Sequence, residues 1–236
     1  MIEFNLEEKH QIFPMHEPLH TESKKEFQLE RLVLFSDAVF AIAITLLIIE
    51  IKVPDPKNEV TEIAVVQGVV KLIPKFIGFI LSFFLIGLYW TVHHRMFGFL
   101  VNYTRKLITL NMIFLLSIVL MPFSTAFYSD YLMPDRIRLI TPLVFYVGNI
   151  LFIGIMNFKL WGYIGNPKNN LAEGIPHGPF IKQAKIRSLA VPLIFCLMIP
   201  VAFFAPVQAR YIPVLIPIVM KIIQRRFKNK IQPAHF

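Results

Sequence analysis

Six long apolar stretches, separated by short polar segments, constrain this chain more than any other feature of its sequence. Crossing about 30 Å of hydrocarbon takes roughly 20 apolar residues in a helix. The stretches lie at residues 32–51, 76–92, 107–127, 139–161, 189–206 and 211–223. They are too long for buried strands and lack the alternating pattern of a membrane barrel. The sequence therefore predicts an all-α integral membrane protein with six transmembrane helices.

The composition agrees with this class of protein. Apolar residues make up 56% of the chain and charged residues 17%, whereas soluble domains have roughly 25% charged residues. A water-soluble enzyme and a disordered chain are both excluded on this basis. The first thirty residues lack the apolar core of a signal peptide, so the first stretch should act as its own insertion signal. The single cysteine, Cys196, allows no intramolecular disulfide.

The distribution of basic residues predicts the orientation and the domain boundaries. We expect a polar N-terminal segment (1–30), a six-helix transmembrane domain (31–226) and a basic tail (227–236). With both termini in the cytoplasm, most of the 24 Lys and Arg residues lie on the cytoplasmic side, as the positive-inside rule requires. The net charge of +9 then needs no nucleic-acid partner.

The segments between the stretches are less uniform. Residues 60–75 are mostly apolar and predict either an interfacial helix or an extension of the second span. Residues 165–180 are rich in Gly, Pro and Asn, which predicts a loop. The last two stretches are separated only by Val-Gln-Ala-Arg, so we expect them to form a helical hairpin.

Several polar residues lie at one depth near the cytoplasmic end of the first three helices. They are Ser36, Asp37, Trp90, His93, His94 and Asn111. Ionisable groups in a membrane face protein or water, so this cluster predicts either a hydrogen-bonded clamp or a proton-coupled site. A metal site is not expected, since adjacent helical residues such as His93 and His94 point about 100° apart.

An apolar stripe follows the first helix. Ile42, Thr45, Leu46 and Ile49 are spaced at i, i+3, i+4 and i+7 and share one face. Such a stripe contacts lipid or other helices, or lines a pore where several copies of the helix meet around an axis. Hydrophobic rings can gate a pore by dewetting.

The sequence Arg31-x-x-x-Phe35-Ser36-Asp37, followed by AVFAIAITLLIIEI, resembles the first-helix signature of a known family. This is the endosomal and lysosomal potassium channel family, transmembrane protein 175, in its prokaryotic branch with one six-helix unit per chain. The segments YWTVHHRMF and LITLNMIFLLSIVLMPFST support the resemblance, which covers the first three helices. A single unit favours a bacterial or archaeal cell membrane.

The resemblance implies a homotetrameric, potassium-permeable cation channel whose first helix lines the pore. It also implies that no carbonyl filter provides the selectivity, and the chain contains no Thr-Val-Gly-Tyr-Gly sequence. Ile42 matches the hydrophobic constriction, which Leu46 and Ile49 continue, and Thr45 matches a hydroxyl layer associated with potassium preference. The motif's structural network is matched by Arg31, Phe35, Ser36 and Asp37, with Trp90, His93, His94 and Asn111 as candidate partners.

The expected partners are further copies of the chain, membrane lipid and monovalent cations, without a cofactor. The alternative is a proton-coupled secondary transporter that uses Asp37 with His93 and His94, although the chain shows no inverted repeat. A membrane enzyme is a third class. The sequence has no Gly-rich phosphate loop, no Gly-x-Ser-x-Gly and no paired acidic residues within the spans, so an enzyme is not expected.

Overall fold

The computed structural model describes residues 19–54, 61–132, 136–176 and 178–228. Within these residues, six helical segments are long and apolar enough to cross a membrane. They lie at Lys24–Ile49, Glu62–Phe97, Arg105–Asp130, Ile140–Ile164, Pro179–Phe204 and Pro206–Phe227. The predicted six-helix membrane fold is confirmed. Of the predicted terminal segments, residues 1–18 and 229–236 lie outside the described part of the chain.

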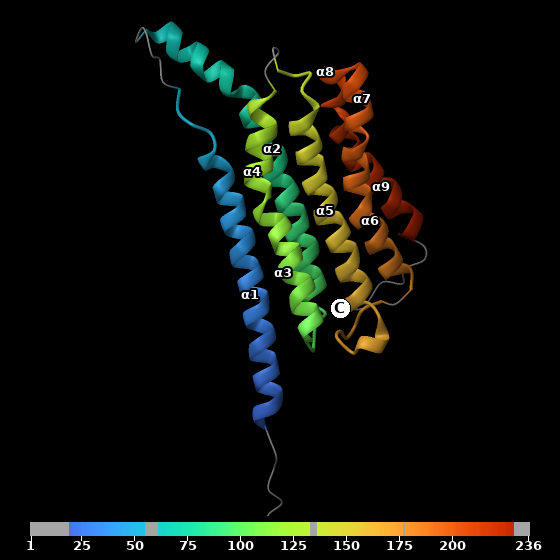
Figure 1. Cartoon of the computed structure of the whole chain (residues 1–236). Helices are drawn as coiled ribbons and strands as arrows, with labels where there is room; N and C mark the ends of the chain where they lie inside the picture. The colour runs from blue at the N-terminus through green and yellow to red at the C-terminus, as the bar shows by residue number, and fades with distance from the viewer. Residues whose placement is uncertain (1–18, 55–60, 133–135, 177, 229–236) are drawn as a thin grey trace, which may run out of the picture.

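The first two helices extend well beyond the apolar stretches that predicted them. α1 (Leu19–Ile49) begins within the expected polar segment, before residue 31. α2 (Glu62–Phe97) absorbs the ambiguous residues 60–75 from position 62 onward, so this segment continues the second span. The hydroxyl of Thr61 caps α2 by accepting a hydrogen bond from the amide of Ala64. Pro74 lies inside α2, and the part of α2 before it projects away from the bundle in Figure 1.

Proline positions explain where the third and fifth spans are interrupted. The third span consists of α3 (Arg105–Val119) and α4 (Met121–Asp130), with Pro122 in the first turn of α4. The fifth consists of α6 (Pro179–Cys196) and α7 (Met198–Phe204). Pro200 has no N–H for the carbonyl of Cys196, the last residue of α6. Each interruption therefore coincides with a missing backbone donor.

The remaining elements complete the bundle. α5 (Ile140–Ile164) is its most buried span. The turn between the last two spans contains α8 (Pro206–Ala209) and the 3₁₀ turn η2 (Ile212–Val214), and α9 (Leu215–Lys228) then returns along α6. This is the predicted hairpin. The predicted loop after α5 contains the 3₁₀ turn η1 (Pro167–Asn169), and an isolated bridge joins Leu100 to Ala172.

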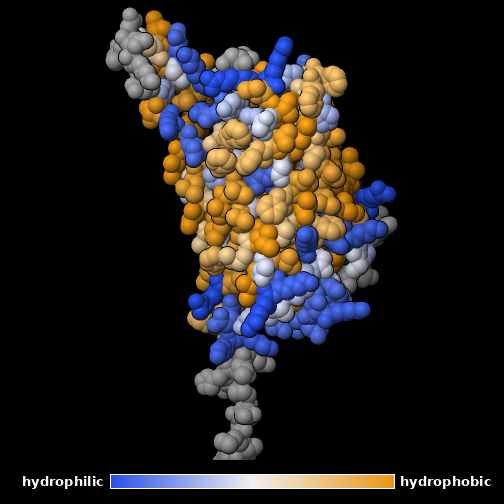
Figure 2. Space-filling model, in the orientation of Figure 1, coloured by the Kyte–Doolittle hydropathy of each residue, from blue (hydrophilic) through white to orange (hydrophobic). Residues whose placement is uncertain are grey.

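The bundle has a close-packed centre, with α1 at its edge. α5 packs against α3, α4 and α6, whereas α1 contacts α2, α3 and α4 (Figure 1). The largest fully buried side chains include Phe40, Phe114, Tyr146 and Phe195. On the face shown in Figure 2, an apolar band crosses the middle of the molecule, and hydrophilic residues gather towards its two ends. One face of α1 is thus left without a neighbour in this subunit.

Candidate functional site

The predicted apolar stripe lies on the free face of α1. Ile42 is 58% exposed, Leu46 39% and Ile49 67%, and Thr45 between them is also exposed. We call these four residues the α1 stripe. Ser36, Phe40, Ala43 and Leu47, on the other side of the helix, are buried in the bundle. The stripe therefore faces lipid or another subunit, because its own subunit covers only the opposite face.

The hydroxyl of Thr45 is oriented by its own helix. It donates a hydrogen bond of 2.9 Å to the backbone carbonyl of Ile42, one turn earlier. This uses the single proton of the hydroxyl and leaves lone pairs on its oxygen free to accept from water or to contact a cation. The polar Thr45 hydroxyl thus lies among the apolar side chains of Ile42, Leu46 and Ile49 on one face of α1.

A chain of buried hydrogen bonds holds α1 against α2 and α3. The side-chain amide of Asn111 donates to the hydroxyl of Ser36 at 2.9 Å, and that hydroxyl donates to the carbonyl of Leu32 at 2.8 Å. The amide oxygen of Asn111 accepts from Nε2 of His93 at 2.9 Å. Ser36, His93 and Asn111 are at most 1% exposed. Three helices are therefore joined through one asparagine.

Aromatic rings surround His93. Its ring stacks on Phe97 with the centroids 3.8 Å apart, and it lies 5.5 Å from both Phe40 and Phe114. Its Nδ1 atom is buried and has no hydrogen-bond partner among the described residues. The imidazole thus has one polar contact, to Asn111, and otherwise packs as an apolar ring.

Asp37 makes a second contact between α1 and α2. The indole Nε1 of Trp90 donates to Oδ1 of Asp37 at 2.9 Å. Trp90 is 40% exposed, and the ring of His94 lies 5.5 Å from its indole. Asp37, Trp90 and His94 therefore form a more open group beside the buried group of Ser36, His93 and Asn111. We call the five hydrogen-bonded residues the α1 network: Ser36, Asp37, Trp90, His93 and Asn111.

Two motif residues lie outside the α1 network. The guanidinium of Arg31 lies over the ring of Phe27, 5.8 Å from its centroid, and within the described residues it forms no ion pair with Asp37. Phe35 is 48% exposed and lies on the same side of α1 as the stripe. The motif therefore divides between the two faces of the helix, with Ser36 inward and Phe35 outward.

The sequence did not single out a further group of polar residues among α2, α4 and α5. The hydroxyl of Thr125 donates to Ser82 at 2.7 Å, and Ser82 and Tyr146 share a hydrogen bond of 2.9 Å. Asn149 donates to Ser124 at 3.2 Å. The Ser and Thr residues within the apolar stretches of the sequence could have predicted this group, since membrane helices are often joined through such side chains.

No group of three or more His, Cys, Asp or Glu residues suited to a metal ion occurs in the part of the chain that the structure describes.

The comparisons with known proteins identify relatives of this chain. The profile of a family described as the endosomal/lysosomal potassium channel TMEM175 matches residues 31–122, which include the α1 stripe and the α1 network. A protein of Chamaesiphon minutus named as a potassium channel is 34% identical over 152 residues, covering 64% of this chain and 73% of that protein. The human endosomal/lysosomal proton channel TMEM175 is 39% identical over 104 residues, which are 42% of this chain and 19% of that protein.

A solved structure resembles the whole bundle. The crystal structure of a lysosomal potassium-selective channel TMEM175 homolog from Chamaesiphon minutus superposes with a TM-score of 0.67. The two chains are 25% identical, and the match covers 85% of this chain and 98% of the other. The likeness therefore extends over the last three helices, where the sequence motifs carried no resemblance.

Proposed function

This chain belongs to the TMEM175 family of ion channels, and from that premise we propose that it is a potassium-permeable cation channel with a pore lined by α1. The observation that carries the proposal is the uncovered α1 stripe at the edge of the bundle. One helix cannot enclose a pore, so the proposal requires several copies of the chain. Four copies, as the family resemblance implies, would bring four α1 helices together around an axis.

Ile42 forms the constriction in this proposal. An isoleucine side chain has no group that can replace the hydration shell of an ion, so a narrow ring of Ile42 would exclude water and resist conduction. Leu46 and Ile49 continue the same surface along α1. Conduction then requires the four α1 helices to rotate or separate until a hydrated or partly hydrated ion can pass.

Thr45 supplies the selectivity in this proposal. Its hydroxyl proton is engaged by the carbonyl of Ile42, which supports a role for its oxygen as a cation contact. A ring of hydroxyl oxygens contacts a partly dehydrated ion more weakly than rings of carbonyls do in a filter. We therefore expect a modest preference for potassium over sodium, with potassium itself as the permeant species and no cofactor.

The α1 network sets the rotation of α1 in this proposal. The contacts of Ser36 and Asp37 with α2 and α3 turn the opposite side of the helix, with Ile42, away from the subunit. A change in the network should therefore alter assembly and the closed pore together.

The proposed location is the cell membrane, with both termini in the cytoplasm. The basic residues at the N-terminal end of α1 and the C-terminal end of α9 support this orientation, since cytoplasmic segments carry an excess of Lys and Arg.

Flux from liposomes reconstituted with the purified protein tests the function. Potassium efflux is measured with a proton ionophore for charge balance, with empty liposomes as the control. A channel passes potassium down any gradient without saturation and also admits other large monovalent cations. Saturable uptake driven by a proton gradient would instead favour a transporter that uses Asp37 and the histidines. A proton flux without the ionophore would extend the permeant ions to protons, the ion for which the human relative is named.

A further inference from the structure

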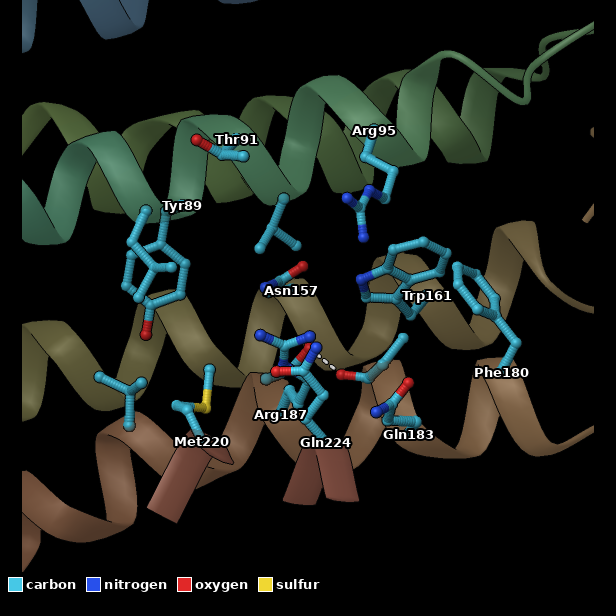
Figure 3. Close-up of a pocket in the computed structure, with 15 residues that line it drawn as sticks. Tyr89, Thr91, Arg95, Asn157, Trp161, Phe180, Gln183, Arg187, Met220 and Gln224 are labelled. Atoms are coloured by element: carbon cyan, nitrogen blue, oxygen red, sulfur yellow. Dashed lines mark hydrogen bonds between the residues drawn. The ribbon is translucent and has the colours of Figure 1, made fainter. Parts of the chain in front are cut away.

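A cavity of about 310 Å³ lies between α2, α5, α6 and α9, away from the α1 stripe. It is near the end of the bundle at which α2 and α5 end and α6 begins. Its volume is at the lower end of the range for small-molecule sites, roughly 300 to 1,000 Å³. Figure 3 shows polar side chains from α2, α5, α6 and α9 pointing into this space.

Two arginines line the cavity without a negative partner. Arg95 comes from α2 and Arg187 from α6, and their positive charges repel one another. Arg187 is half-buried, while Arg95 is exposed at the edge of the cavity. None of the residues lining the cavity is acidic, and within the described residues neither arginine forms a salt bridge. Burial disfavours the charge of Arg187 and Arg95 adds repulsion, so an anion in the cavity would stabilise both guanidinium groups.

Buried polar atoms with no partner line the same cavity. The indole Nε1 of Trp161, the hydroxyl of Tyr89 and the amide oxygen of Asn157 form no hydrogen bond within the described residues. Trp161 and Asn157 are 2% exposed and Tyr89 is 3% exposed. The indole N–H of Trp161 is a donor, the hydroxyl of Tyr89 can donate or accept, and the amide oxygen of Asn157 is an acceptor. Buried donors are normally paired, so Trp161 and Tyr89 indicate a ligand that carries acceptor atoms.

The rest of the lining suits a ligand that is partly apolar. Leu88, Val191 and Met220 form part of the wall, next to the amides of Gln183 and Gln224. We propose that this cavity binds a phosphate-bearing anion between Arg95 and Arg187, presented as a phospholipid headgroup or as a free phosphate. Guanidinium groups match the oxygens of phosphate in bidentate geometry. The proposal is independent of the proposed ion conduction.

Melting of the detergent-solubilised protein tests the proposal directly. The melting temperature is measured with rising concentrations of a short-chain phosphatidylglycerol, of inorganic phosphate, and of the zwitterionic short-chain phosphatidylcholine, at constant ionic strength. A ligand that binds only the folded state raises the melting temperature. We expect phosphatidylglycerol to raise it more than phosphatidylcholine. A higher melting temperature with inorganic phosphate as well would show that a free anion is sufficient for binding. A higher melting temperature with phosphatidylglycerol alone would show that binding also requires the acyl chains.

Variants show whether any rise comes from this cavity. Arg187→Gln and Arg95→Gln each remove a charge-assisted contact, and each should weaken the apparent affinity at least about tenfold. Lys159→Gln is the matched control, because Lys159 is an exposed basic residue of α5 that does not line the cavity. Met220→Trp fills the cavity without changing a charge and should abolish the rise. No rise with either anion, an equal rise with phosphatidylcholine, or unchanged affinities in the folded variants would overturn the proposal.

Discussion

Phe40 and Ile42 lie on nearly opposite sides of α1, where Phe40 is 1% exposed and Ile42 is 58% exposed. Two residues that are two positions apart on an α-helix point in directions about 200° apart. The packing of Phe40 against His93 and Phe114 therefore directs Ile42 away from the subunit. In the proposed channel, this relationship couples the core of each subunit to the pore.

Replacing Ile42 by a polar residue should open the proposed constriction. Ile42→Asn removes the apolar ring that excludes water, so the resting potassium leak from liposomes should rise several-fold. Ile48→Asn is the matched control, since Ile48 is an exposed isoleucine of α1 that lies about 120° around the helix from Ile42. An equal leak in both variants, or none in well-assembled Ile42→Asn, would remove Ile42 as the gate.

Removing the Thr45 hydroxyl should lower the preference for potassium. Thr45→Ala removes the oxygen that contacts the ion in this proposal, a contact comparable in free energy to one neutral hydrogen bond, about 1 kcal/mol. The potassium-to-sodium permeability ratio, measured from reversal potentials, should therefore fall about fivefold. Thr45→Ser keeps the hydroxyl and its bond to the Ile42 carbonyl, and should retain the ratio. An unchanged ratio in Thr45→Ala would assign selectivity to other residues.

Truncating Asn111 should destabilise the bundle. Asn111→Ala leaves His93 Nε2 without its buried partner and removes a bond to Ser36, at a cost of about 2 kcal/mol. The melting temperature of the solubilised protein should fall by roughly 4 to 8 °C. Thr109→Ala is the control on the same helix, because the exposed Thr109 hydroxyl bonds only to the carbonyl of Arg105. Similar melting of the two variants would show that the α1 network adds little stability.

A side chain at Gly154 should separate α5 from α6. A Cβ atom there would lie 2.2 Å from Pro192 and 2.7 Å from the carbonyl oxygen of Ser188. Gly154→Ala should therefore cost about 1 to 3 kcal/mol by overpacking. Gly148→Ala, on the same helix with nothing within 4 Å of the new Cβ, should leave the melting temperature unchanged or raise it. A wild-type melting temperature for Gly154→Ala would mean that the two helices are free to move apart.

The ion pair between Lys75 and Asp130 should contribute little to the stability of the folded protein. The two side chains are 26% and 50% exposed, and exposed pairs contribute less than about 1 kcal/mol. Lys75→Gln should shift the melting temperature by less than Asn111→Ala does, and salt should barely change the wild-type value. A larger loss in Lys75→Gln would indicate that this contact joins α2 and α4 more strongly than its exposure suggests.

The individual side-chain contacts could be predicted only in part. Depth along the helices correctly grouped Ser36, His93 and Asn111, because residues at one level of a bundle lie near one another. Depth does not give the rotation of each helix, so the position of Arg31 over Phe27 was not predictable, and the sequence could not choose Trp90 from among the candidate partners of Asp37. Hydropathy also placed the start of α1 too late, since its first turns are helical although they are polar.

The sequence by itself determined that this chain forms six membrane-spanning helices, because a segment of roughly 20 apolar residues in lipid must satisfy its backbone hydrogen bonds internally. It also determined that Ile42, Thr45, Leu46 and Ile49 share a face, since the helical repeat is local. Only the tertiary structure decided that this face is the uncovered one. It also brought Arg95 and Arg187 together across a cavity, because such pairings depend on how helices distant in the sequence pack.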